Sequence, residues 1–134
     1  MAVVLDSSAV IGFLDRDDAL HEAAARAVRE LGREQRLAVS VVTYAEVLTG
    51  ARLGHHDEER VAGFFADLIS EVIPVDVAVA ETAADIRARL KSLRMPDALI
   101  LATAEVRPDV GLVISGDLSA SRVPALDTQI RLLN

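Results

Sequence analysis

Four acidic residues are spaced along the chain in a pattern that could support metal-ion chemistry. Asp6 and Asp117 each follow a short apolar run by no more than three residues, Glu46 follows another, and Asp97 opens a long apolar segment. In an open α/β sheet, ligands bind at the carboxyl ends of the strands. Carboxylates gathered there raise one another's pKa unless a cation compensates, and Mg²⁺ or Mn²⁺ prefers such oxygen ligands. The four acids therefore predict a metal site that could ionise a water and clamp a scissile phosphate.

Each acid also has an ordinary structural interpretation. Asp6 could cap a helix that begins at Ser7, and Asp117 could be a turn residue. Glu46 lies three residues after Thr43, which is the spacing of a capping box. Asp97 could simply complement the dipole at a helix N-terminus. The metal-site hypothesis depends on all four acids meeting at one edge.

Rival active sites have little support in the sequence. Neither a phosphate-binding loop nor a dinucleotide-binding glycine motif occurs, and there is no cysteine for a nucleophile or a thiolate zinc site. The only lysine is Lys91, within a helical segment, so a phospho-acceptor receiver domain is not predicted. His21, His55 and His56 are separated from the acids in sequence, and we expect all three at the surface.

Short continuous apolar runs alternate with amphipathic segments along the whole chain. The runs predict strands at residues 3–5, 37–41, 72–75, 111–114 and, more weakly, 123–126. Helical spacing of apolar residues predicts helices over residues 20–31, 61–69 and 79–90, and a buried helix over 97–106. Continuous runs indicate strands buried on both faces. The predicted fold is a three-layer α/β/α sandwich with a mostly parallel central sheet, in one domain spanning residues 1–134.

Composition narrows the class of protein. The chain has 134 residues, 51% of them hydrophobic, which suits one globular domain. No apolar run is long enough for a membrane helix, and the N-terminus has no basic segment typical of a signal peptide. We therefore expect a cytoplasmic protein that does not bind membranes. The net charge of −7 argues against general nucleic-acid binding.

Four segments together resemble the signature of the PIN-domain family. They read Val-Leu-Asp-Ser-Ser at 4–8, Ser-Val-Val-Thr-Tyr-Ala-Glu at 40–46, Asp-Ala-Leu-Ile-Leu-Ala-Thr-Ala at 97–104 and Ile-Ser-Gly-Asp at 114–117. The third segment is particularly similar to the VapC toxins of toxin–antitoxin pairs. The resemblance covers essentially the whole chain.

This resemblance implies a metal-dependent endoribonuclease, with Asp6 and Asp97 as the principal Mg²⁺ or Mn²⁺ ligands. Glu46 and Asp117 would hold a second metal or position water, and the hydroxyls of Ser7 and Ser115 would orient the acids. It also implies RNA products with 5′-phosphate and 3′-hydroxyl ends, a small VapB-like antitoxin that fills the acidic groove, and a homodimer. Two alternatives remain open, a non-catalytic PIN scaffold and a small phosphate-ester hydrolase.

The acidic net charge and an RNA substrate can be reconciled locally. Setting the four acids aside leaves 17 acidic residues against 14 basic ones, and two divalent ions would neutralise the four. Arg87, Arg89, Lys91 and Arg94 precede Asp97 closely, and with Arg52 they could border the site and contact phosphates. They could equally be solvated charges on helices.

Overall fold

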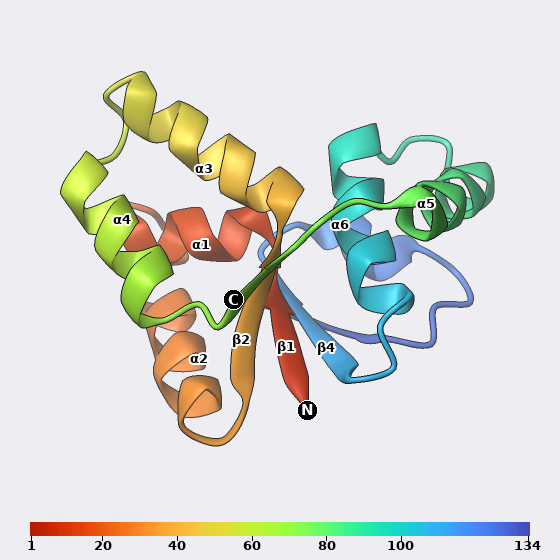
Figure 1. Ribbon diagram of the computed structural model, residues 1–134, viewed down its shortest axis with the longest axis horizontal. Helices are drawn as coiled ribbons and strands as arrows, with labels where there is room; N and C mark the ends of the chain where they lie inside the picture. The colour runs from red at the N-terminus through yellow and green to blue at the C-terminus, as the bar shows by residue number, and fades with distance from the viewer.

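Five parallel strands form one central sheet, in the order β3-β2-β1-β4-β5. The computed structural model describes all 134 residues of the chain. β1 lies in the middle of the sheet and pairs with β2 on one side and β4 on the other (Figure 1). The strands are β1 (Ala2–Leu5), β2 (Arg36–Ser40), β3 (Glu71–Ile73), β4 (Val110–Ser115) and β5 (Gln129–Leu132).

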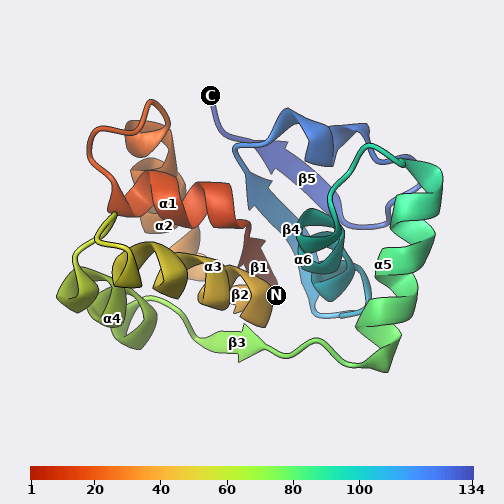
Figure 2. The ribbon, with the colours of Figure 1, turned by 90° about the horizontal axis from the view of Figure 1, so that it is seen from above.

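Six α-helices cover the two faces of this sheet, as Figures 1 and 2 show. Helices α1 to α4 lie on one face, and α5 and α6 pack against each other on the other face. The helices are α1 (Ser7–Leu14), α2 (His21–Glu34), α3 (Val41–Arg52), α4 (Glu58–Asp67), α5 (Val77–Arg89) and α6 (Met95–Glu105), with a short 3₁₀ helix η1 (Leu118–Arg122). The predicted three-layer α/β/α architecture is confirmed.

The hydrophobic core has two halves, one on each side of the sheet. Successive side chains of a strand point to opposite faces. In β1, Val3 and Leu5 therefore join the cluster beneath α1 to α4, whereas Ala2 and Val4 join the cluster beneath α5 and α6. All four residues are buried, which explains why the strand reads as a continuous apolar run.

The last strand is not where the sequence predicted it. Residues 123–126 form an irregular segment, and the strand is Gln129–Leu132. Pro124 has no amide hydrogen to donate to a ladder, and Ala125 has a positive φ of 61°, which is incompatible with a strand. The real strand β5 is an edge strand whose residues alternate between exposed and half-buried, so it lacks the continuous apolar run of the others.

The chain reverses direction across the sheet at its centre. It passes outward from β1 through β2 to β3, and then crosses back to β4 on the other side of β1. The carboxyl ends of β1 and β4 are therefore neighbours at a topological switch point, which is where open α/β sheets bind their ligands. None of the helices combines the length and hydropathy needed to span a bilayer.

Candidate active site

Asp6 is placed by the end of β1 and the start of α1. Its backbone amide donates to Ile114 O at 2.9 Å, which extends the β1–β4 pairing by one residue. Its Oδ1 caps α1 by accepting from the Ser7 amide at 2.6 Å, and its Oδ2 accepts from Ser115 Oγ at 2.6 Å. The residue is only 6% exposed. The predicted capping role is therefore real, and it fixes a buried carboxylate at the switch point.

The charge of Asp6 is not neutralised by any neighbour. Burial raises the pKa of this carboxyl, because a charged group loses its hydration. The hydrogen bonds from Ser115 and Ser7 lower the pKa, while the negative charges of Asp97 and Asp117 raise it. The net effect is a raised pKa, caused mainly by burial and reinforced by the two neighbouring acids.

Glu46 projects toward the same place from α3. This helix is capped by Ser40, whose Oγ accepts from the Val42 amide at 3.1 Å, so the capping-box interpretation centred on Thr43 is wrong. Thr43 lies inside the helix, fully buried, with its Oγ1 3.0 Å from Ser7 Oγ. Ser7 Oγ donates to Glu46 Oε1 at 2.7 Å. Because 43 and 46 are one turn apart, both side chains meet Ser7 on the same helix face.

Asp97 and Asp117 complete the set from the other side of the sheet. Asp97 is the third residue of α6, and its Oδ2 lies 3.5 Å from Arg94 Nε. Asp117 caps η1 by accepting from the Ser119 amide at 2.9 Å, and its own amide donates to Ser115 Oγ at 3.0 Å. Ser115 thus links two acids, since it also donates to Asp6.

All four predicted acids line one cleft of about 280 Å³ at the carboxyl edge of the sheet. Only one of its lining residues, Ile11, is apolar, and only one, Arg94, is cationic. The full lining is Asp6, Ser7, Ser8, Ile11, Glu46, Arg94, Asp97 and Asp117. A concave site made of carboxylate and hydroxyl oxygens, with a net negative charge, has the chemistry that a hard divalent cation requires.

The carboxylates are not closed around an ion position. No group of three or more carboxylate or imidazole side chains is arranged so that it could hold a metal ion as the structure stands. Three of the acids are instead held by different partners, Asp6 by Ser115, Glu46 by Ser7 and Asp117 by the η1 backbone, and Asp97 lies beside Arg94. The donor set fits a divalent metal, and the individual ligand roles stay predictions.

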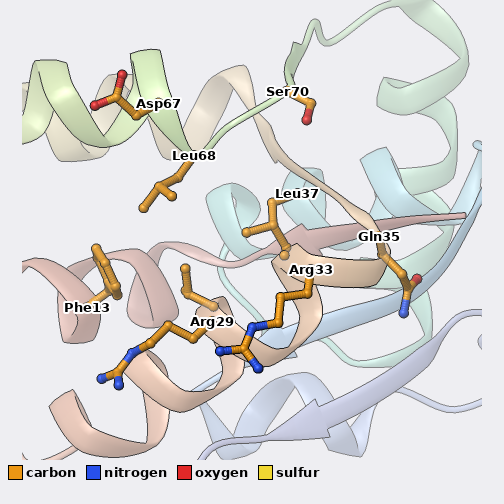
Figure 3. Close-up of a pocket in the computed structure, with 10 residues that line it drawn as sticks. Phe13, Arg29, Arg33, Gln35, Leu37, Asp67, Leu68 and Ser70 are labelled. Atoms are coloured by element: carbon orange, nitrogen blue, oxygen red, sulfur yellow. The ribbon is translucent and has the colours of Figure 1, made fainter.

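Two larger hollows lie away from the acids and lack their chemistry. One, of about 610 Å³, lies between α2 and the end of α4, and Figure 3 shows Arg29, Arg33 and a single carboxylate, Asp67, around it. The other, of about 840 Å³, is mainly apolar and lies between α3 and α4, where Glu58 pairs with Arg52 at 2.8 Å. Neither hollow gathers carboxylates from several elements, so the smaller cleft is the better candidate for catalysis.

Of the five basic residues that could have bordered the site or been solvated helix charges, only Arg94 borders it. Arg87 donates to backbone carbonyls of residues 91 and 93, and Arg89 donates to those of residues 124 and 125. Arg52 is engaged with α4, and Lys91 does not line the cleft. The three histidines also lie outside it. The cleft is therefore bordered by one basic residue, whereas the sequence offered five candidates.

Two hydroxyl residues at the site were not singled out by sequence reasoning. Ser8 lines the cleft and accepts from the Gly116 amide at 2.8 Å, and Thr43 contacts Ser7 from beneath. Ser8 follows Asp6 by two residues on the first turn of a helix, and Thr43 precedes Glu46 by one turn. Their spacing from the predicted acids could have identified both Ser8 and Thr43 as site residues.

Comparison with known proteins gives a consistent family assignment. The sequence model of the PIN domain matches residues 3–126, nearly the whole chain. No curated protein matches by sequence.

Several solved structures share the fold over their full length. VapBC2 from Rickettsia felis, bound to a promoter DNA fragment, superposes with a TM-score of 0.79 at 13% identity, covering 100% of both chains. VapBC-5 from Mycobacterium tuberculosis, a toxin–antitoxin system, gives 0.64 at 28% identity, covering 98% of both. VapC20 from the same organism, a toxin that cleaves the sarcin-ricin loop, gives 0.70 at 16% identity, covering 95% of this chain and 98% of the other.

Proposed function

The chain belongs to the PIN-domain family, and from this premise we propose that it is a metal-dependent endoribonuclease of the VapC toxin type. We also propose that residues 1–134 act as a single PIN domain in the cytoplasm. The observation that carries the proposal is the shared cleft: four carboxylates, from the ends of two strands and from two helices, line one concave site. A structural scaffold gains nothing from this arrangement, because crowded like charges oppose folding.

We assign the metal to the acids at the centre of the cleft. Asp6 and Asp97 would hold Mg²⁺ or Mn²⁺, and Glu46 and Asp117 would hold a second ion or position water. A bound divalent ion would supply a hydroxide-like nucleophile near neutral pH and neutralise charge on the phosphate. The proposal is supported by the oxygen-only donor set and by the raised pKa of Asp6, which is caused mainly by burial and reinforced by the neighbouring Asp97 and Asp117.

The surrounding hydroxyls would keep the acids in position. Ser115 donates to Asp6 Oδ2, the Ser7 amide donates to Asp6 Oδ1, and the Ser7 hydroxyl donates to Glu46 Oε1. Each carboxylate oxygen has two lone pairs, so these bonds leave acceptor positions for an ion or a water. Hydrogen bonds to the charged form favour that form, so they also oppose protonation of these acids. The expected products are RNA fragments with 5′-phosphate and 3′-hydroxyl ends.

We further propose an antitoxin partner and a homodimer. Solved structures of VapBC complexes with the same fold support the first, and an acidic cleft with one exposed arginine would suit a basic antitoxin side chain. Exposed apolar side chains at the starts of α5, α6 and η1 support the second; these are Val77, Met95 and Leu118. Light scattering should give a dimer at micromolar concentration, and a monomer would remove that part of the proposal.

A cleavage assay separates this function from its alternatives. The purified protein is incubated with transfer, ribosomal and messenger RNA, with single-stranded DNA, and with small phosphate esters, in Mg²⁺, in Mn²⁺ and in excess chelator. We expect metal-dependent cleavage of a subset of the RNAs only. Turnover of small esters alone would indicate a phosphate-ester hydrolase, and inactivity on every substrate would favour the scaffold.

A further inference from the structure

The acid cleft has many acceptors and very few hydrogen-bond donors. Four of its eight lining residues are carboxylates, which accept only when ionised. Its side-chain donors are Ser7, Ser8 and Arg94. A phosphodiester also offers only acceptor oxygens, so a substrate phosphate that enters this cleft needs the few protons that remain available.

Two of the three donors are poorly suited to this task. The single hydroxyl proton of Ser7 is committed to Glu46 Oε1 at 2.7 Å. The Arg94 side chain is 72% exposed and makes only a long, 3.5 Å contact with Asp97, so solvent screens its charge. Ser8 is half-buried in the cleft wall and is the remaining donor.

Ser8 is held in place, yet its proton has no good acceptor. Its Oγ accepts from the Gly116 amide at 2.8 Å, which fixes the side chain. The nearest acceptors for its own proton are Asp6 Oδ2 at 3.4 Å and Ser115 Oγ at 3.5 Å. Hydroxyl donors normally approach oxygen to about 2.5–3.0 Å. Asp6 Oδ2 already accepts a 2.6 Å bond from Ser115, and Ser7 donates to Glu46 at 2.7 Å, so Ser8 makes the longest and weakest bond of the three serine hydroxyls beside these acids.

The backbone around Gly116 is shaped to allow this arrangement. A Cβ at position 116 would clash with Cδ1 of Leu20 and would lie 3.4 Å from the Cβ of Ser8. The missing side chain leaves room for Leu20, and the loop after β4 passes at contact distance from α1, where its amide donates to Ser8. The donor is therefore supported by two elements of the fold at once, the first turn of α1 and the end of β4.

We propose that Ser8 is a substrate-binding residue, which donates its hydroxyl proton to a non-bridging oxygen of an RNA phosphate in the acid cleft. Gly116 acts through Ser8 as the group that orients it. The inference rests on the proposed ribonuclease function and adds to it a specific contact with the RNA backbone. Because every nucleotide has a phosphate, this contact should help to hold the strand without selecting its sequence.

Equilibrium binding tests the proposal most directly. The probe is a fluorescently labelled single-stranded RNA that the wild-type protein cleaves, and binding is followed by anisotropy in the Asp97→Asn background, where we expect no cleavage. Adding Ser8→Ala should weaken binding roughly tenfold or more, as for a lost hydrogen bond to a charged group. The matched control is Ser121→Ala, since the Ser121 hydroxyl donates to Leu118 O outside the cleft. This control should bind as the parent does.

A double-mutant cycle then locates the contact. Single methylphosphonates, which remove the charge and one oxygen of a phosphate, are placed in turn along the RNA. At one position the methylphosphonate should reduce the binding affinity of the parent protein much more than that of the Ser8→Ala variant, because the two changes remove the same interaction. Additive losses at every position would overturn the proposal.

Cleavage kinetics distinguish this role from loop positioning and from failure of the proposed function. In an otherwise wild-type chain, Ser8→Ala should raise KM more than it lowers kcat, as expected for lost substrate binding. Unchanged RNA affinity combined with a lower kcat would mean that Ser8 only positions the Asp117 loop, and the proposal would fail. If the wild-type protein cleaves no RNA, the failure belongs to the ribonuclease function itself.

Discussion

At the amino edge of the sheet Glu71 and Asp109 each contact an arginine, whereas at the carboxyl edge four carboxylates share one exposed arginine. Arg107 makes two bonds to Glu71, at 2.9 and 3.0 Å, and two to Asp109, at 2.9 and 3.0 Å. Arg36 makes a further bond to Asp109 at 2.9 Å. These hydrogen bonds, chiefly from Arg107, lower the pKa of Asp109 to about 2, and the same arginine lowers the pKa of Glu71.

The carboxyl edge shows the opposite electrostatic behaviour. There burial raises the pKa of Asp6, and two neighbouring acids raise it further. Both edges carry acidic side chains beside strand ends, but only at the amino edge do arginines hydrogen-bond to them. The amino edge is therefore organised for stability, whereas the carboxyl edge retains an unfavourable charge that an external cation or ligand would neutralise.

The largest expected effect comes from matched substitutions at the two edges. Asp6→Asn and Asp97→Asn should each reduce RNA cleavage by about a hundredfold or more, because an amide keeps the shape of the side chain but not the charge that a metal requires. Asp109→Asn, at the amino edge, should leave cleavage unchanged. Initial rates at saturating Mg²⁺ provide the measurement. Normal cleavage by both carboxyl-edge variants would place the active site elsewhere.

A smaller effect is expected at Glu46. Glu46→Gln should lower cleavage well over tenfold while changing the free energy of unfolding by no more than about 0.5 kcal/mol, since no core packing changes. Glutamine can still accept the proton of Ser7, so the local hydrogen bond survives while the charge is lost. Urea titration and cleavage rates on the same sample test both statements. Full activity would reduce the functional acids to three aspartates.

The smallest effects are opposite pH dependences of stability at the two edges. The folded-state pKa of Asp6 lies above its ordinary value of 3.8, so its unfavourable contribution is present at neutral pH and disappears as the pH falls through that raised pKa. Asp6→Asn should therefore be more stable than the wild type at pH 7 without metal, and the difference should vanish near pH 3.8.

For Asp109 the sign is reversed. Its folded-state pKa of about 2 lies below 3.8, so its stabilising contribution is present above pH 3.8 and is lost between there and about pH 2. Asp109→Asn should be less stable than the wild type at pH 7, by an amount that shrinks over that window. Urea unfolding in chelator, from pH 7 downward, measures both variants. If the two variants shift stability in the same direction at pH 7, the contrast between the edges is wrong.

The sequence predicted the architecture and the acids because both depend on short, local patterns. Continuous apolar runs such as residues 3–5 indicate strands buried on both faces, and the strand-end rule then brings Asp6 and Asp117 to one edge. Edge strand β5 was misplaced because only alternate residues are half-buried, whereas Val123 and Leu126 pack against the core without strand pairing. Burial and strand pairing are separate properties that composition does not distinguish.

The details of the site depend on contacts between distant segments, which spacing alone does not determine. Ser7 meets Glu46 across 39 positions of the chain, and Ser115 meets Asp6 across 109. The partners of the arginines could not be predicted either. Arg87 and Arg89 donate to backbone carbonyls of irregular segments, and the sequence does not specify the course of those segments. Only Arg94, nearest to Asp97 in sequence, borders the cleft.

Metal binding to the free protein tests the central claim most directly, since it requires neither an RNA substrate nor an antitoxin. Isothermal titration of Mn²⁺ or Mg²⁺, with a parallel thermal melt, compares the wild type with Asp97→Asn and Asp109→Asn. We predict saturable binding and a raised melting temperature for the wild type and Asp109→Asn, by preferential binding to the folded state, and the loss of both in Asp97→Asn. Equal binding by all three proteins, or no binding by the wild type, would contradict the account.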